Sequence, residues 1–156
     1  MLFQREKYEE YQRQGVSVCD EWLNFDVFKK WYERNYYEVG NEQMHIDKDI
    51  LKHGNLVYCP EHCVFVPRTI NMLFVRNKNE RNGLPIGVYK SQGKFISCCS
   101  VFGKNIKKRH GDPISAFEEY KRVKENYVKT VAKQYKDKIP ENLYNAMIMF
   151  EVKIDD

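Results

Sequence analysis

The chain has 156 residues, which suits one medium-sized domain or two small ones, and its hydrophobic content of 42% excludes wholesale disorder. It contains no run of about 18 apolar residues and no signal-peptide pattern, so we expect a soluble protein that is not exported and has no membrane partner. The net charge of +4 excludes little by itself. Five cysteines, with Cys98 and Cys99 adjacent, argue against a disulfide framework and for a reducing compartment.

Two helices are expected at the start of the chain. Residues 2–14 are polar and charged, with two tyrosines three positions apart, which favours a helix. Asn24 suits the N-cap of a second helix, in which four aromatic residues recur at helical spacing: Phe25, Phe28, Trp31 and Tyr32. We interpret this aromatic stripe as packing residues and not as a ligand site.

The next segment predicts a strand, a turn, a strand and a helix. Residues 44–50 alternate between apolar and polar side chains, "KHGN" supplies a turn, and "LVY" continues the strand. "CVFVP" reads as a second strand, and Pro67 can open the helix "RTINMLFVRN". The polar stretch that follows divides the chain into a first domain over 1–76, a linker over 77–84 and a second domain over 85–156.

The second domain is predicted to be a sheet followed by a helix. Gly87, Gly93 and Gly103 stand at intervals of roughly ten residues, which is typical of a three-stranded antiparallel meander. Asp112 as N-cap and Pro113 at the first helical position begin a long helix, and a short helix follows Pro140. The fold class is therefore α+β.

The positive charge is concentrated in one segment. Residues 1–75 carry 9 basic and 12 acidic side chains (net −3), residues 76–110 carry 9 and 1 (net +8), and residues 111–156 carry 8 and 9 (net −1). A patch of this kind can release counterions from a nucleic-acid backbone, although a solvated surface is the alternative reading. The candidate DNA-binding residues on the predicted sheet are Lys90, Lys94, Lys104, Lys107, Lys108 and Arg109.

Two groups of side chains suggest metal binding. Cys59 and Cys63 flank His62, but a structural zinc site needs a second pair of ligands, and Cys19 or His53 would supply one only by an accident of folding. We therefore interpret the thiols as packing groups and expect no zinc. Asp47 on a strand and Asn71 on the following helix could share one Mg²⁺, which prefers oxygen ligands and retains water. The alternative is that Asp47 is a surface charge and Asn71 a polar helix residue.

The segment "IDKDILKHGNLVYCPEHCVFVPRTIN" resembles the ββα-metal core of phage-type HNH endonucleases, and the resemblance extends over about Val16 to Phe74. It implies Mg²⁺ on Asp47 and Asn71, and it places His62 where a residue that supports the general base usually lies. Lys48 occupies the place of the general-base histidine. A protonated lysine is a poor base but can bind the scissile phosphate, so His45 or His53 would have to act as the base.

The segment "GVYKSQGKFISCCSVFGKNIKKRHGDPISAFEEYKRVKENYVKTVA" resembles the three-strand-plus-helix DNA-binding domain named after the plant APETALA regulators. The resemblance implies that the sheet enters the major groove and that its lysine and arginine side chains contact bases and phosphates. One departure is that "KKRHGDP" stands where the family has "LG-x-F" before the helix.

Together the two resemblances imply a phage-encoded, HNH-homing-endonuclease-like protein that binds DNA in the cytoplasm of a bacterial host and cleaves phosphodiesters with Mg²⁺. The rival hypothesis is a non-catalytic protein that keeps the HNH fold as a scaffold and acts by binding DNA or a protein partner, as an inhibitor of a nucleic-acid-processing machine. Lys48 favours this rival. Neither hypothesis requires a small-molecule cofactor.

Overall fold

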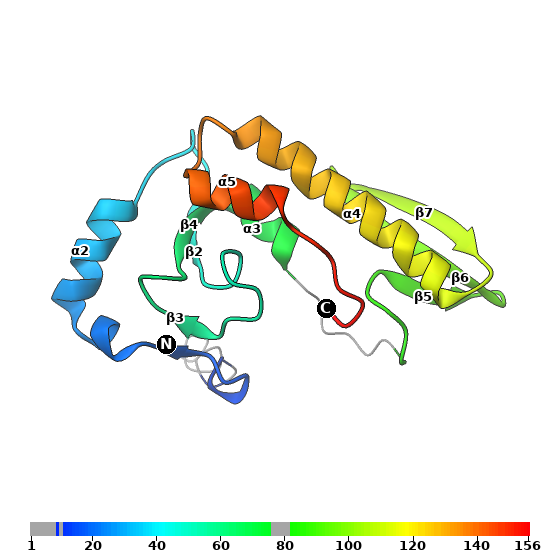
Figure 1. The fold of residues 1–156 in the computed structure, drawn as a ribbon, viewed down its shortest axis with the longest axis horizontal. Coiled ribbons are helices and arrows are strands. Elements are labelled where there is room, and N and C mark those ends of the chain that lie inside the picture. The colour runs from blue at the N-terminus through cyan, green and yellow to red at the C-terminus, as the bar shows by residue number, and fades with distance from the viewer. Residues whose placement is uncertain (1–8, 10, 76–81) are drawn as a thin grey trace. The chain divides into compact units, whose positions relative to one another are not determined.

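The computed structural model describes residues 9, 11–75 and 82–156, and the fold is mixed α+β. The chain divides into two compact units (Figure 1). The first unit comprises residues 1–74 and 138–143, and the second comprises residues 75–137 and 144–156. Within the described ranges, none of the helices combines the length and the apolar composition needed to cross a bilayer.

Two small sheets and two α-helices form the first unit between residues 17 and 74. The elements of this stretch are β1 (Ser17–Val18), the 3-10 helix η1 (Asp20–Leu23), α2 (Phe25–Asn35), β2 (Met44–Asp47), β3 (Val57–Tyr58), β4 (Val64–Pro67) and α3 (Arg68–Phe74). Strand β2 pairs with β4 in antiparallel orientation, and β1 pairs with β3 in parallel orientation.

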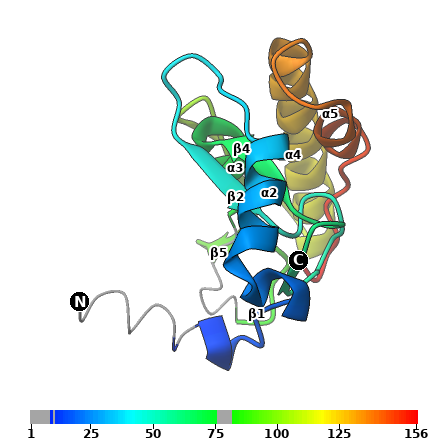
Figure 2. The same ribbon diagram turned by 90° about the vertical axis from the view of Figure 1, so that its left-hand side faces the viewer.

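Strands β2 and β4 and helix α3 form the frame of the first unit (Figure 2). All of β4 is buried, and Val66 and Ile70 are fully buried where α3 packs against the two strands. The predicted order of two strands and a helix is confirmed here. Strand β2 is shorter than predicted and ends at Asp47, whose side chain binds the backbone of the next turn. The residues expected to continue this strand, Val57–Tyr58, pair with β1 instead.

Helix α2 begins where the sequence predicts. The side chain of Asn24 caps it by accepting hydrogen bonds from the backbone N–H groups of Asp26 (3.0 Å) and Val27 (3.4 Å). Three of the four aromatic residues pack as expected, with the Trp31 ring 4.6 Å from the Trp22 ring and 5.3 Å from the Phe65 ring, centroid to centroid, and with Phe28 and Tyr32 in ring contacts of their own. The prediction is wrong for Phe25, which is 71% exposed at the first position of the helix. No residue of α2 is fully buried, so the helix is held mainly through these ring contacts.

The second unit is built on an antiparallel sheet and a long helix. The elements from residue 82 onward are β5 (Val88–Ser91), β6 (Lys94–Val101), β7 (Lys104–His110), α4 (Pro113–Tyr135) and α5 (Glu141–Ile148), of which residues 141–143 belong to the first unit. The sheet order is β5-β6-β7, and α4 runs along one face of the sheet (Figure 1). This arrangement confirms the predicted meander and the predicted helix start at Pro113.

The core of the second unit joins the sheet, α4 and the end of the chain. Val88, Ala116, Phe117 and Val152 form a buried apolar cluster. The backbone N–H of Val152 donates to Glu125 Oε1 (2.9 Å), and its carbonyl accepts from Lys121 Nζ (2.8 Å). An ion pair on α4 therefore satisfies both main-chain groups of a buried residue and fixes the C-terminal segment over the cluster.

Two sequence predictions fall largely outside the described residues. The helix expected over 2–14 is described only at residues 9 and 11–13, which are helical. The linker expected over 77–84 is described only from residue 82 onward. The predicted helix after Pro67 ends at Phe74 within the described part of the chain.

Candidate functional site

The end of β2 is organised by the carboxylate of Asp47. Its Oδ1 atom accepts the backbone N–H groups of Asp49 (2.9 Å) and Ile50 (2.8 Å), so the carboxylate ends the strand and shapes the turn that follows. Burial raises the pKa of Asp47 above its ordinary value, and the hydrogen bond from Ile50 opposes this shift. The carboxylate is thus partly committed to the local backbone.

Asn71 of α3 meets His45 of β2. The amide Nδ2 of Asn71 lies 3.3 Å from Nδ1 of His45. Since an amide nitrogen can only donate, Nδ1 is the acceptor and a neutral ring carries its proton on Nε2. The Nε2 atom is buried and has no hydrogen-bond partner among the described residues. His45 stands two positions before Asp47, so the two side chains share one face of β2.

A magnesium ion would find few protein ligands here. Among the described residues, no group of three or more His, Cys, Asp or Glu side chains is placed to hold one metal ion. Asp47 Oδ2 and Asn71 Oδ1 each lack a hydrogen-bond partner in the described part of the chain, and both are oxygen donors of the kind that Mg²⁺ accepts. Magnesium binding by Asp47 and Asn71 therefore stays a prediction.

Lys48 lies between a carboxylate and an aromatic ring. Its side chain is only 14% exposed, its Nζ lies 3.7 Å from Asp49 Oδ1, and it stands 5.9 Å from the centre of the Tyr58 ring. Both neighbours are ones that a lysine side chain commonly contacts in proteins. The loop that follows is closed by Asn55, whose Nδ2 donates to the carbonyls of Lys48 and Val57, both at 2.7 Å.

The other histidines of this segment face different partners. His62 Nε2 lies 3.2 Å from Lys52 Nζ, so the histidine nitrogen accepts from the ammonium. His53 is exposed on the intervening loop. Of the histidines in this segment, only His45 is brought to Asn71 in the described structure.

The cysteines of this region pack as apolar groups, as the sequence predicts. Cys59 and Cys63 are buried, and all five thiols of the chain are free. Burial raises the pKa of Cys63 to about 12, so its thiol stays protonated at neutral pH. A metal or a nucleophilic reaction would need the thiolate.

The register of the three-stranded sheet sorts its basic residues by face. Val88 and Phe95 pack with α4, and Phe95 stands opposite Lys90 on β5 and opposite His110 on β7. Since side chains opposite one another in a sheet share a face and alternate along each strand, the helix-side face carries Lys90, Lys104 and Lys108. The ion pair between Lys108 and Glu119 of α4, with 3.8 Å between Nζ and Oε1, agrees with this placement.

The open face of the sheet carries the other three basic residues. These are Lys94, Lys107 and Arg109, each of which is one or three positions along its strand from a residue of the helix-side face. The neutral side chains of this face are Tyr89, Ser91, Ile96, Cys98, Ser100 and Asn105. No aspartate or glutamate occurs anywhere between residues 82 and 110.

Long side chains lie over the centre of the open face. The Nζ atom of Lys107 stands 5.8 Å from the centre of the Tyr89 ring, and Arg109 Nη2 donates to Gln92 Oε1 at 3.3 Å. Ile96 is at the middle of this face but only 6% exposed. Its low exposure follows from its cross-strand neighbours, because Tyr89 and Arg109 flank it directly in the sheet.

Sequence reasoning named all six basic residues but missed how the faces divide them, and it missed Tyr89, Gln92 and Asn105. The sequence does contain the information that assigns each residue to a face. Counting positions outward from the two-residue hairpin turns at Gln92–Gly93 and Phe102–Gly103 predicts which strand residues share a face. Comparison with known proteins adds no relative: no protein-family model, no curated protein and no solved structure matches this chain.

Proposed function

We propose that the chain binds double-stranded DNA through the open face of the β5-β6-β7 sheet. The observation that carries the proposal is the placement of Lys94, Lys107 and Arg109 on the face that α4 leaves uncovered, in a segment without acidic residues. Such a face attracts the phosphate backbone and releases its counterions.

The dimensions and the side chains of this face support duplex binding. Neighbouring strands lie about 4.8 Å apart, and the major groove, about 12 Å wide, admits a two-stranded ribbon, so two adjacent strands of the sheet can enter it. Arg109 and Asn105 are residue types that hydrogen-bond base edges, whereas Lys94 and Lys107 suit phosphates. Tyr89 is the one large aromatic side chain of the described open face, and a single ring offers little platform for stacking several unpaired bases.

The test compares two triple variants with equal loss of charge. One replaces Lys94, Lys107 and Arg109 by glutamine, and the other replaces the helix-side residues Lys90, Lys104 and Lys108. If Lys94 and Lys107 each contact one phosphate and Arg109 contacts a base edge, the first variant should reduce the steepness of the plot of log K against log salt by about 1.8, at about 0.9 per phosphate. The helix-side variant should keep most of the slope. Equal losses in both variants would contradict the proposal, since net charge alone would then explain the binding.

A second candidate function is Mg²⁺-dependent cleavage of phosphodiesters in the first unit. It is favoured by the position of His45 and Asp47 on one face of β2, with Asn71 of α3 against His45. The contacts of Lys48 favour the opposite view, in which the unit is a scaffold without catalysis and the protein acts by binding DNA or another protein.

A plasmid-nicking assay with Mg²⁺ separates these views. Cleavage by the unaltered protein that is lost in Asp47→Ala and in Asn71→Ala would support catalysis at this site. An inert protein that gains metal-dependent nicking through Lys48→His would support a scaffold that lacks a base. Cleavage that survives both alanine substitutions would reject the site.

A further inference from the structure

We propose that the first unit carries a docking surface for a protein segment that combines large apolar residues with lysine or arginine. The surface, termed here the acidic-apolar patch, lies at the junction of η1 and α2 and consists of Asp20, Glu21, Leu23, Phe25 and Asp26. It belongs to the first unit, whereas the proposed DNA-binding face belongs to the second.

Two large apolar side chains of the patch are turned to solvent. Leu23 is 74% exposed and Phe25 is 71% exposed, and only Asn24 separates them in the sequence. Single exposed apolar residues are common, but two large ones with one residue between them expose an unusual amount of apolar surface over a short segment. Removing both from water would contribute to binding, and an aromatic anchor in a pocket is a frequent centre of protein interfaces.

The backbone holds this pair in place. Trp22 is buried, and its ring lies 5.1 Å from the Phe28 ring and 4.6 Å from the Trp31 ring, centroid to centroid. On the other side of Leu23, the Asn24 side chain caps α2 through two backbone hydrogen bonds. A segment fixed at both ends loses little further conformational freedom on binding, which favours recognition.

The charges around the pair indicate the chemistry of the partner. Asp20, Glu21 and Asp26 are exposed, and in the described part of the chain none of them has an ion-pair partner. Glu33 further along α2 differs, because it pairs with Lys29 at 3.8 Å. Three unpaired carboxylates repel nucleic acid and anionic lipid and attract a basic surface. The occupant that fits both features is a protein segment with large apolar residues beside lysine or arginine.

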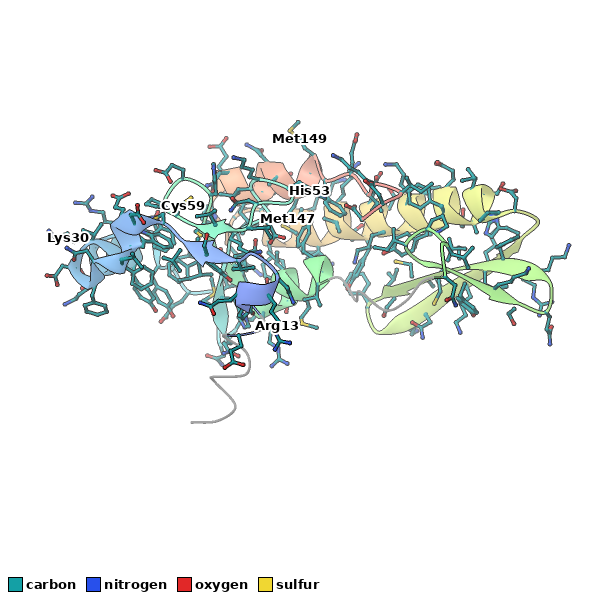
Figure 3. All side chains as sticks on the ribbon, turned by 90° about the horizontal axis from the view of Figure 1, so that it is seen from below. Arg13, Lys30, His53, Cys59, Met147 and Met149 are labelled. Atoms are coloured by element: carbon teal, nitrogen blue, oxygen red, sulfur yellow. The ribbon has the colours of Figure 1, made fainter. Side chains whose placement is uncertain are left out.

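The test uses a displayed library of random peptides, selected on the full chain. We expect the selected peptides to combine lysine or arginine with large apolar residues and to bind less tightly as salt increases. Leu23→Ser with Phe25→Ser should weaken their binding at least tenfold, as should Asp20→Asn with Glu21→Gln. The matched control is Met149→Ser, because Met149 is 78% exposed, points away from the ribbon in Figure 3 and lies outside the patch. The control should bind as the unaltered chain does.

Several results would overturn the proposal. The first is a selection in which no peptide is enriched, and the second is a set of enriched peptides that lack basic residues. The third is equal binding of the enriched peptides to the unaltered chain and to both patch variants. Sedimentation of the full chain provides a separate check: self-association that disappears in the Leu23→Ser, Phe25→Ser variant would assign the patch to a second copy of the chain. If the Leu23→Ser, Phe25→Ser variant fails to fold, the Asp20→Asn, Glu21→Gln variant still tests whether the patch binds the peptides. DNA affinity should be unchanged in all of these variants, so failure here is distinguishable from failure of DNA binding.

Discussion

The buried carboxylate of Asp47 allows its hydrogen bonds and its charge to be tested separately. Asp47→Asn keeps an oxygen that can accept the N–H groups of Asp49 and Ile50, but it removes the charge. Asp47→Ala removes both. Leaving two partly buried donors unsatisfied costs about 1 kcal/mol each, so Asp47→Ala should destabilise the first unit by about 2 kcal/mol.

The effect of Asp47→Asn should depend on pH in a defined direction. Because burial raises the pKa of Asp47 in the folded state, the wild-type chain loses stability as the pH rises through that value. The asparagine variant lacks this loss. The free energy of unfolding of the variant, measured relative to that of the wild type, should therefore increase as the pH rises above the ordinary aspartate range, near pH 3.9. This difference should become constant once the carboxyl of the folded wild type is ionised.

The assay is denaturant unfolding followed by tryptophan fluorescence, in EDTA, at a series of pH values. Trp22 and Trp31 are the only tryptophans of the chain, and both lie in the first unit, so the signal reports that unit alone. Adding Mg²⁺ should then stabilise the wild type and not Asp47→Asn, if the proposed cation site exists. Asparagine and alanine variants that are equally destabilised at every pH would refute this account of the carboxylate.

Two further predictions concern the second unit. Gly87→Ala should lower the stability of this unit by about 1–3 kcal/mol more than Gly93→Ala. Both glycines have positive φ, but a Cβ at Gly87 would overlap the Tyr120 ring, whereas a Cβ at Gly93 meets nothing within 4 Å. Circular dichroism melts of the two variants measure the difference, and equal losses of stability would contradict the prediction. Cys98 lies on the open face and Cys99 is buried on the helix side, so a maleimide should label Cys98 before Cys99, and DNA should protect Cys98. Cys19 of the first unit, whose exposure is also intermediate, serves as the internal reference. Labelling of Cys98 that is unaffected by saturating DNA would contradict the proposed interface.

The arrangement of the sheet could be predicted largely from the sequence, because its turns follow local rules. Gln92–Gly93 and Phe102–Gly103 are two-residue connections with positive φ at both positions, as in the tightest hairpin turns, and such turns fix the register of the strands they join. The face covered by α4 could not be predicted in this way. Strand β6 has apolar residues in both phases, with Phe95 on one face and Ile96 on the other, so alternation alone does not distinguish them.

The strand–helix site of the first unit was less predictable, because it depends on contacts between distant residues. The order of two strands and a helix follows from local patterns. The sequence does not reveal that Asp47 uses one oxygen to hold its own turn, nor that Asn71 meets His45, because 26 positions separate the latter two residues. The pairing of β3 with β1 has the same cause, since nothing near Val57 indicates a partner at Ser17.

The basic residues of β7 also bear on how the protein behaves at high concentration. This strand is an outer strand of the sheet, and nearly all of its residues are exposed, so its unpaired backbone groups could template a strand from another copy. Lys104, Lys107, Lys108 and Arg109 oppose such pairing by mutual repulsion between copies. Substitutions that neutralise these residues should therefore favour edge-to-edge aggregation. Bound DNA would also screen their charges, so the protein should stay dispersed on DNA only if the DNA itself covers this edge strand.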